Sequence, residues 1–157
     1  MPDESSNDTK VQLTIGIKAS ASRVWSVLTD PAQLGKWMLE EGLDVHSEGA
    51  VGGAIVFRGD LHGIDFETRG TIEAFESERV FAYRYWSTLS HPTLPDVPEN
   101  YAVIRFELEP IESGTGLTIT LEKFPDDSTF HHANFYWSVA IERLREFCED
   151  RASSAGR

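Results

Sequence analysis

An aromatic-rich segment in the middle of the chain carries Arg84, the basic residue best placed to bind an anionic ligand group. In one strand register Arg84 faces the interior together with Trp86, and its guanidinium could bind a ligand carboxylate. In the other register Arg84 faces solvent, while Phe81, Tyr83 and Tyr85 face inward. The pattern leaves both registers open, and Arg84 and Trp86 are candidate ligand-binding residues.

The histidines and the cysteine do not form a motif for metal binding or nucleophilic catalysis. His131 and His132 are adjacent, so on a helix their side chains point about 100° apart and cannot chelate one ion. His46, His62 and His91 fall in separate turn or loop segments. No Ser-His-Asp, glycine-rich phosphate-binding or CxxC motif occurs. We therefore predict no catalytic residue, no metal site and no cofactor.

Apolar residues at strand and helix spacing could line an interior cavity for a ligand, or could simply fill the core. Both interpretations remain open. Asn134 lies one helical turn before Trp137 and could reach such a cavity or face solvent. The apolar candidates are Trp37, Met38, Phe57, Phe66, Ile104, Phe106, Leu121 and Trp137.

Periodicity predicts the elements that hold these residues. Residues 11–17 alternate apolar and polar, which is typical of a half-buried strand. Two short helices follow, the first capped by Ser20 and the second by Asp30, with Pro31 at its first position. Residues 43–124 favour about six strands, interrupted by a proline-containing loop over 87–100.

The pattern also predicts the register of one hairpin and the position of the last helix. The turn Asp60-Leu61-His62-Gly63 predicts a hairpin in which Phe57 lies opposite Phe66, and Ile55 opposite Thr68. A long helix is predicted over roughly 128–150, with an apolar stripe that needs the inner face of the sheet as its partner. The fold class is therefore α+β, a bent antiparallel sheet around a C-terminal helix.

Bulk composition limits the domain count and the classes of partner. The chain has 157 residues, 40% of them hydrophobic, which indicates one domain over 10–150 with flexible tails at 1–9 and 152–157. The net charge of −12 disfavours nucleic acid and anionic membrane surfaces. The lone Cys148 lies on the apolar helix face and is predicted to be buried. No leader or membrane-spanning segment is predicted, and a cytoplasmic location is expected.

Five strings in this order resemble the activator of Hsp90 ATPase homologue family, within the SRPBCC/START-like superfamily. The resemblance covers about residues 10–150 and implies the helix-grip fold. Many relatives carry a histidine late in the fourth string, where this chain has Leu121, and that departure weakens any expectation of acid–base chemistry. The strings are ASASRVWSVLTDPAQLGKWM, GGAIVFRG, RGTIEAFESERVFAYRYW, SGTGLTITLEKF and FYWSVAIERLREF.

Three functions follow as expectations from the resemblance. The first is binding of a small hydrophobic or amphipathic molecule between the sheet and the helix. The second is a protein-interaction role with a chaperone such as Hsp90, in a stress-response setting, as a monomer or homodimer. The third is a cyclase-like or hydrolase-like enzyme, for which Arg84 with a buried carboxylate or tyrosine is the available polar pair. Fold alone does not choose among them.

Overall fold

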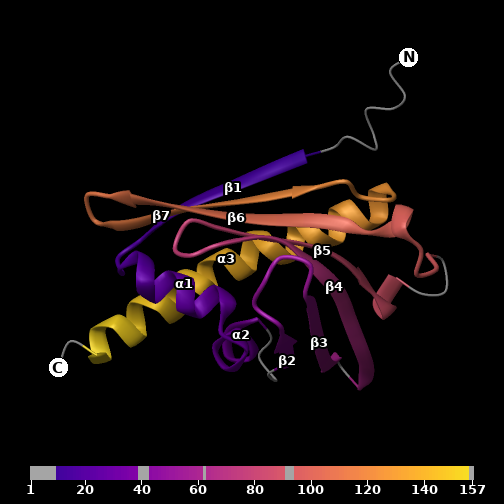
Figure 1. Cartoon of the computed structure of the whole chain (residues 1–157), viewed down its shortest axis with the longest axis horizontal. Helices are drawn as coiled ribbons and strands as arrows, with labels where there is room; N and C mark the ends of the chain where they lie inside the picture. The colour runs from indigo at the N-terminus through magenta and orange to yellow at the C-terminus, as the bar shows by residue number, and fades with distance from the viewer. Residues whose placement is uncertain (1–9, 39–42, 62, 91–93, 156–157) are drawn as a thin grey trace, which may run out of the picture.

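The computed structural model describes residues 10–38, 43–61, 63–90 and 94–155. It contains a long C-terminal helix, two short helices after the first strand, and strands that fill most of the chain between them (Figure 1). The elements are β1 (Lys10–Ile17), α1 (Ala21–Thr29), α2 (Pro31–Trp37), β2 (Asp44–Ser47), β3 (Ala54–Leu61), β4 (Ile64–Glu76), β5 (Val80–Ser87), β6 (Ala102–Ile111), β7 (Gly114–Glu122) and α3 (Asp127–Ala155), with single 3₁₀ turns η2 (Thr88–Ser90) and η3 (Pro98–Asn100) between β5 and β6.

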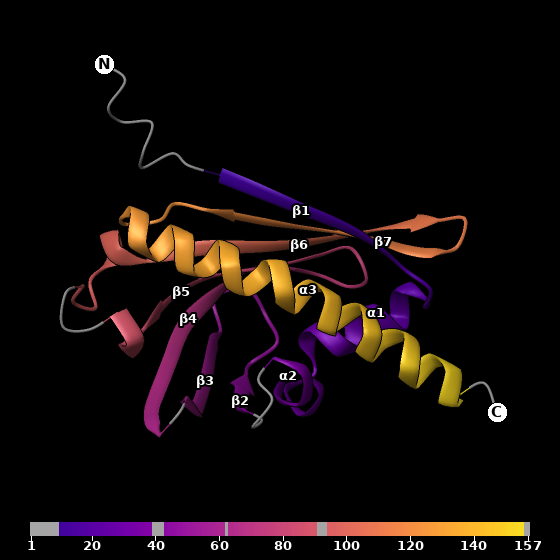
Figure 2. The ribbon, with the colours of Figure 1, turned by 180° about the vertical axis from the view of Figure 1, so that it is seen from behind.

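The seven strands form one antiparallel sheet in the order β1-β7-β6-β5-β4-β3-β2. β1 returns to pair with β7, so the first and last strands of the chain are neighbours. The sheet is strongly bent: β3 and β4 run away from the direction of β6 and β7, and α3 lies across the concave side (Figure 2). The helix-grip fold predicted from the sequence is confirmed.

Local side-chain contacts explain where the two short helices begin. The Ser20 hydroxyl accepts a hydrogen bond from the Arg23 backbone N–H at 3.1 Å, and the Asp30 carboxylate accepts one from the Ala32 N–H at 3.1 Å. Each contact satisfies an amide that has no partner inside its helix. Pro31 occupies the first position of α2. Both predicted caps are confirmed.

The long helix α3 buries the predicted apolar stripe against the inner face of the sheet. Trp137, Ile141, Leu144 and Cys148 are all buried. Burial raises the pKa of the Cys148 thiol to about 12, so the thiol is protonated at neutral pH. The helix ends at Ala155, five residues beyond the predicted end, so residues 152–155 of the predicted C-terminal tail are helical instead. Within the described residues, no helix has the length and apolar character needed to cross a bilayer.

The β3–β4 hairpin has a different register from the predicted one. Phe57 lies opposite Thr68, and Ile55 opposite Gly70, because the strands pair up to Leu61 and Ile64. The connecting loop is thus two residues long instead of four, which moves the pairing by two positions and keeps the same residues on the same face. His62, in this loop, lies outside the described residues, as do His91 and the predicted tail residues 1–9 and 156–157.

Candidate functional site

Most of the predicted cavity-lining residues pack against one another in the core between the sheet and α3. The Trp137 ring lies 5.6 Å from the ring of Phe106 and 6.1 Å from that of Trp37, in edge-to-face contacts. Ile104 and Leu121 are cross-strand partners and are fully buried. Leu121 therefore contributes apolar packing to this core.

Trp37 and Met38, at the end of α2, anchor that helix to its neighbours through their polar groups. The Trp37 indole N–H donates to the Val27 carbonyl at 3.1 Å. The Arg143 Nε donates to the Trp37 carbonyl at 3.0 Å, and the Tyr136 hydroxyl donates to the Met38 carbonyl. Both side chains are buried. The backbone carbonyls of Trp37 and Met38 thus connect α2 to α3 through hydrogen bonds.

Phe57 and Phe66 lie on the inner face where the sheet bends away. The Phe57 ring is buried and lies 5.8 Å from the Tyr83 ring. Phe66 is half-buried and sits opposite Gly59, and a β-carbon built at Gly59 would come within 3.2 Å of the Phe66 ring and 2.7 Å of Leu43. A glycine at this position therefore leaves room for the Phe66 ring and the Leu43 side chain.

Arg84 lies on the outer face of the sheet, so the inward-facing alternative is wrong. Its guanidinium forms an ion pair with Glu73 at 3.6 Å and lies 5.9 Å from the centre of the Tyr101 ring. Both members of the ion pair are 44% exposed. The polar pair that an enzyme would need, Arg84 with a buried partner, is not formed.

Trp86 is buried, but on the outer face and beneath the loop between β5 and β6. Its indole N–H donates to the Leu94 carbonyl at 3.0 Å, and the Arg69 guanidinium lies 5.0 Å from its ring. Arg69 also forms an ion pair with Asp96 at 2.9 Å, and Tyr101 donates to the same carboxylate at 2.6 Å. Trp86 therefore holds this loop on the sheet and does not face the helix.

Tyr83 and Tyr85 are inner-face residues that the predicted ligand-binding set omitted. Their ring centres are 5.9 Å apart, and Tyr83 is only 5% exposed. Neither hydroxyl has a hydrogen-bond partner among the described residues, whereas the nearby Tyr136 hydroxyl is bonded to Met38. Burial raises the pKa of both phenols above the ordinary value, so each remains a neutral hydrogen-bond donor.

Asn134 lies half-buried on α3, one turn before Trp137. Its backbone carbonyl accepts a hydrogen bond from the Ser138 hydroxyl at 2.7 Å, while its side-chain amide has no hydrogen-bond partner in the described part of the chain. The sequence left open whether Asn134 reaches the interior or faces solvent, and its half-exposed position is intermediate between the two. The amide thus has free donor and acceptor capacity at the edge of the helix–sheet interface.

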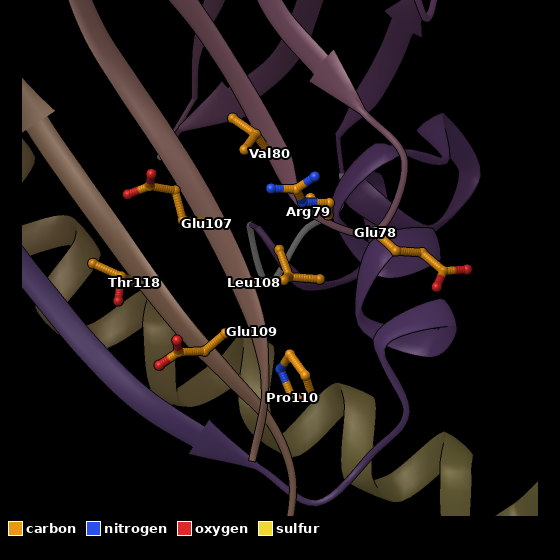
Figure 3. Close-up of a pocket in the computed structure, with 8 residues that line it drawn as sticks. All are labelled: Glu78, Arg79, Val80, Glu107, Leu108, Glu109, Pro110 and Thr118. Carbon is orange, nitrogen blue, oxygen red and sulfur yellow. The ribbon is translucent and has the colours of Figure 1, made fainter.

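A hollow formed by described residues lies on the outer side of the sheet (Figure 3). It has a volume of about 560 Å³, opens to solvent, and includes none of the predicted site residues. One of its carboxylates, Glu107, is 3.3 Å from Arg105 in an exposed ion pair. Its lining residues are Glu78, Arg79, Val80, Glu107, Leu108, Glu109, Pro110 and Thr118.

Histidine, cysteine and carboxylate side chains do not assemble into a metal site within the described ranges. No group of three or more of them is placed to hold one ion there. The chemistry that the inner face offers is therefore apolar contact with aromatic rings, together with hydrogen bonds from neutral phenols.

Comparison with known proteins identifies relatives of the same shape. The family model described as "Activator of Hsp90 ATPase homolog 1-like protein" matches residues 18–149. The solution structure of ChR145 from Cytophaga hutchinsonii is similar with a TM-score of 0.75 and 28% identity, over 92% of this chain and 97% of that one.

Two more distant structures share the fold. Protein CV1439 from Chromobacterium violaceum has a TM-score of 0.73 and 21% identity, over 89% of this chain and 97% of its own. The Aha1 dimer from Colwellia psychrerythraea has a TM-score of 0.70 and 22% identity, over 90% and 96%. A search of curated protein sequences finds no match.

Proposed function

Because this chain belongs to the family of activator of Hsp90 ATPase homolog 1-like proteins, a group with the helix-grip fold, we propose that it binds a small amphipathic molecule on the inner face of its sheet. The observation that supports this most strongly is the pair of neighbouring phenols, Tyr83 and Tyr85, whose hydroxyls lack protein partners among the described residues. The ligand would place its polar end at these hydroxyls and its apolar body against the surrounding rings.

The energetic argument concerns the exchange of water for a ligand acceptor. Among the described residues the Tyr83 and Tyr85 hydroxyl oxygens are not fully buried, so each can reach water in the free protein, and a direct hydrogen bond to a bound acceptor contributes about 0.5–1.5 kcal/mol net. The Tyr136 hydroxyl shows how a nearby phenol is satisfied when a carbonyl is available. A ligand carbonyl or ether oxygen would supply the same kind of acceptor to Tyr83 and Tyr85.

The position of Arg84 narrows the ligand class. A carboxylate buried beside Tyr83 would need a cation close by, because an unpaired charge in an apolar site is strongly disfavoured. Arg84 lies on the opposite face and is paired with Glu73. We therefore favour neutral ligands, such as aromatic or aliphatic ketones, over carboxylic acids.

The half-buried rings mark where such a ligand enters. Phe57 and Tyr83 are buried, whereas Phe66 and Tyr85 are partly exposed. Displacing a partly exposed ring disturbs less packing than displacing a buried one. The proposed entry is therefore between Phe66 and Tyr85, and Asn134 offers a further polar contact at the edge.

A thermal-shift screen with paired ligands tests this function. Aromatic ketones and the carboxylic acids of matching carbon skeleton are added to the wild-type chain, and binding at 100 times Kd stabilises the fold by about 2.7 kcal/mol. Ketones should raise Tm more than their acids. A screen in which no ketone raises Tm would contradict the proposal.

Substitution of the two phenols locates the binding site. The Y83F/Y85F double variant should bind the best ketone about 5–30-fold more weakly, because each lost hydrogen bond is worth about 0.5–1 kcal/mol. Y101F is the matched control, since that phenol lies on the outer face and is bonded to Asp96. Equal affinity in wild type, double variant and control would place the ligand elsewhere.

A chaperone-cofactor role is the second candidate, and an exposed feature of α3 favours it. Phe135 and Val139 lie one turn apart and are 75% and 51% exposed, so together they form a small apolar patch on the surface of α3. We propose this pair as the contact if the chain acts on an Hsp90-type ATPase. The F135S/V139S variant should then lose stimulation of ATPase activity, and a wild-type chain that neither stimulates nor co-elutes with the chaperone would exclude this role.

A further inference from the structure

The strand β1 forms one edge of the sheet and is paired on one side alone. Its eight residues pair with β7 from Lys10, opposite Glu122, to Ile17, opposite Thr115. No other strand of the described residues borders it, and it lies along the rim of the molecule (Figure 1). Alternate residues of an edge strand direct their backbone N–H and C=O groups outward, where another strand can pair with them.

β1 lacks the features by which proteins usually prevent such pairing. Edge strands are commonly protected by proline, a bulge, short length or charged side chains. The stretch from Val11 to Ile17 contains no proline and no charged residue, and its register with β7 is continuous. The one charge of the strand, Lys10, stands at its first position and lies 3.7 Å from Glu122.

The opposite edge of the sheet is protected in the ways that β1 is not. β2 has four residues, begins with Asp44, and is preceded by Leu43, whose N–H donates to the Gly35 carbonyl of α2 at 3.0 Å. Pairing along β2 would gain few hydrogen bonds and would bring a carboxylate into the contact. The two edges therefore differ in length, charge and attachment, and β1 is the open one.

Charge permits a second copy at β1, because the middle of this strand carries no charge. Two chains that each carry a net charge of −12 repel one another, so a self-contact must avoid the acidic surfaces. The exposed residues along β1 are the uncharged Gln12, Thr14 and Gly16, together with Lys10 at its first position, which is paired with Glu122. The half-buried residues, Val11, Leu13 and Ile15, are apolar and pack against the core.

We propose that β1 pairs antiparallel with β1 of a second copy, about a two-fold axis perpendicular to the sheet. Such an axis keeps the inner faces of both sheets on the same side, so the same surface of each copy meets itself. Val11, Leu13 and Ile15 of both chains then meet on one face, and Gln12 and Thr14 on the other. The sheet becomes continuous through both copies, and this inference does not depend on the proposed ligand.

Cross-linking of single cysteine variants tests the contact. Thr14→Cys, near the middle of β1, should form a covalent dimer in high yield with a short bis-maleimide, because paired strands lie about 4.8 Å apart. Thr118→Cys is the matched control: Thr118 is the partner of Thr14 on β7, and its symmetry copy would lie about three strand spacings away, roughly 14 Å. The native Cys148 is buried and should not react.

Sedimentation of a charged variant provides the second measurement. Thr14 is exposed, so Thr14→Lys should fold normally but weaken dimerisation at least tenfold, because like charges would meet across the axis. Ser138→Lys makes the same charge change at an exposed position of α3 and should leave the dimer unchanged.

Three outcomes would overturn the proposal. One is a wild-type chain that stays monomeric at all concentrations tested. Another is a dimer that persists in Thr14→Lys while Thr14→Cys fails to cross-link, since the contact then lies on another surface. The third is dimerisation that occurs only after residues 1–9 are deleted, which would mean that the chain's own N-terminal segment occupies the edge.

Discussion

The two faces of β5 carry different chemistry within eight residues. On the inner face, Phe81 and Tyr83 are buried among other rings, and two phenols lack hydrogen-bond partners in the described structure. On the outer face, Arg84 keeps contact with water and Trp86 lies beneath a loop. The comparison shows that position relative to α3, and not residue polarity, decides which polar groups of this strand have a partner within the protein.

The largest expected effect comes from removing an inner-face ring. Phe106→Ala should destabilise the protein by about 3–5 kcal/mol, because Phe106 is buried and contacts the rings of Phe81 and Trp137. Urea denaturation measures the change. The adjacent Arg105→Ala, on the outer face, should cost less than about 0.5 kcal/mol. Similar losses for both variants would mean that the two faces are not energetically distinct.

Raising the pH should also reveal a difference between the two faces, because the buried phenols of the inner face resist ionisation. The pKa of Tyr83 is raised by burial, so the folded state holds that proton at pH values where the unfolded state releases it. The free energy of unfolding is therefore unaffected well below pH 10, the ordinary tyrosine value, and falls as the pH rises above it, by about 1.4 kcal/mol per pH unit for each such phenol.

The variant Tyr83→Phe isolates this contribution. It should be about as stable as wild type at pH 7, since the hydroxyl that it removes has no hydrogen-bond partner among the described residues. Its stability should fall less steeply than that of wild type above pH 10. Parallel pH profiles for the two proteins, measured by urea denaturation, would show that Tyr83 ionises freely in the folded state.

A smaller effect is expected from weakening the outer-face loop anchor. Trp86→Phe removes the indole hydrogen bond to the Leu94 carbonyl and should cost about 1–2 kcal/mol in thermal denaturation. Trp25→Phe is the control on α1, where the half-buried Trp25 makes an edge contact with Phe75 of the sheet, with ring centres 5.2 Å apart. A larger loss in Trp25→Phe than in Trp86→Phe would contradict an anchoring role for the indole N–H.

The smallest effect is expected at Arg84. Arg84→Ala should change the free energy of unfolding by less than about 0.5 kcal/mol, because its ion pair with Glu73 is exposed and screened by solvent. It should also leave the affinity for a neutral ketone unchanged, which isothermal titration would measure. Weaker ketone binding in this variant would show that Arg84 reaches the ligand after all.

Much of the fold could be predicted from the sequence, since local physics determines it. The period of two over residues 11–17, the caps at Ser20 and Asp30, and the helical stripe ending at Cys148 each depend on nearby residues. The inward positions of Ile104, Phe106 and Leu121 were predicted for the same reason: apolar and polar residues alternate over 104–108 and 117–121.

The candidate site was less predictable, because it depends on how strands meet. In β5 both the odd-numbered and the even-numbered positions carry large or apolar residues, so the sequence pattern fits either orientation of the strand. The pairing of Tyr83 with Ile104 and of Phe81 with Phe106 places the odd-numbered residues on the inner face. The β3–β4 register likewise depended on whether the turn uses two residues or four. The sequence by itself determined the elements and their order, whereas only the tertiary structure decided which residues of β5 face α3. The physical reason is that the face on which a residue lies depends on how its strand pairs with the neighbouring strands, whereas periodicity is present within a single strand.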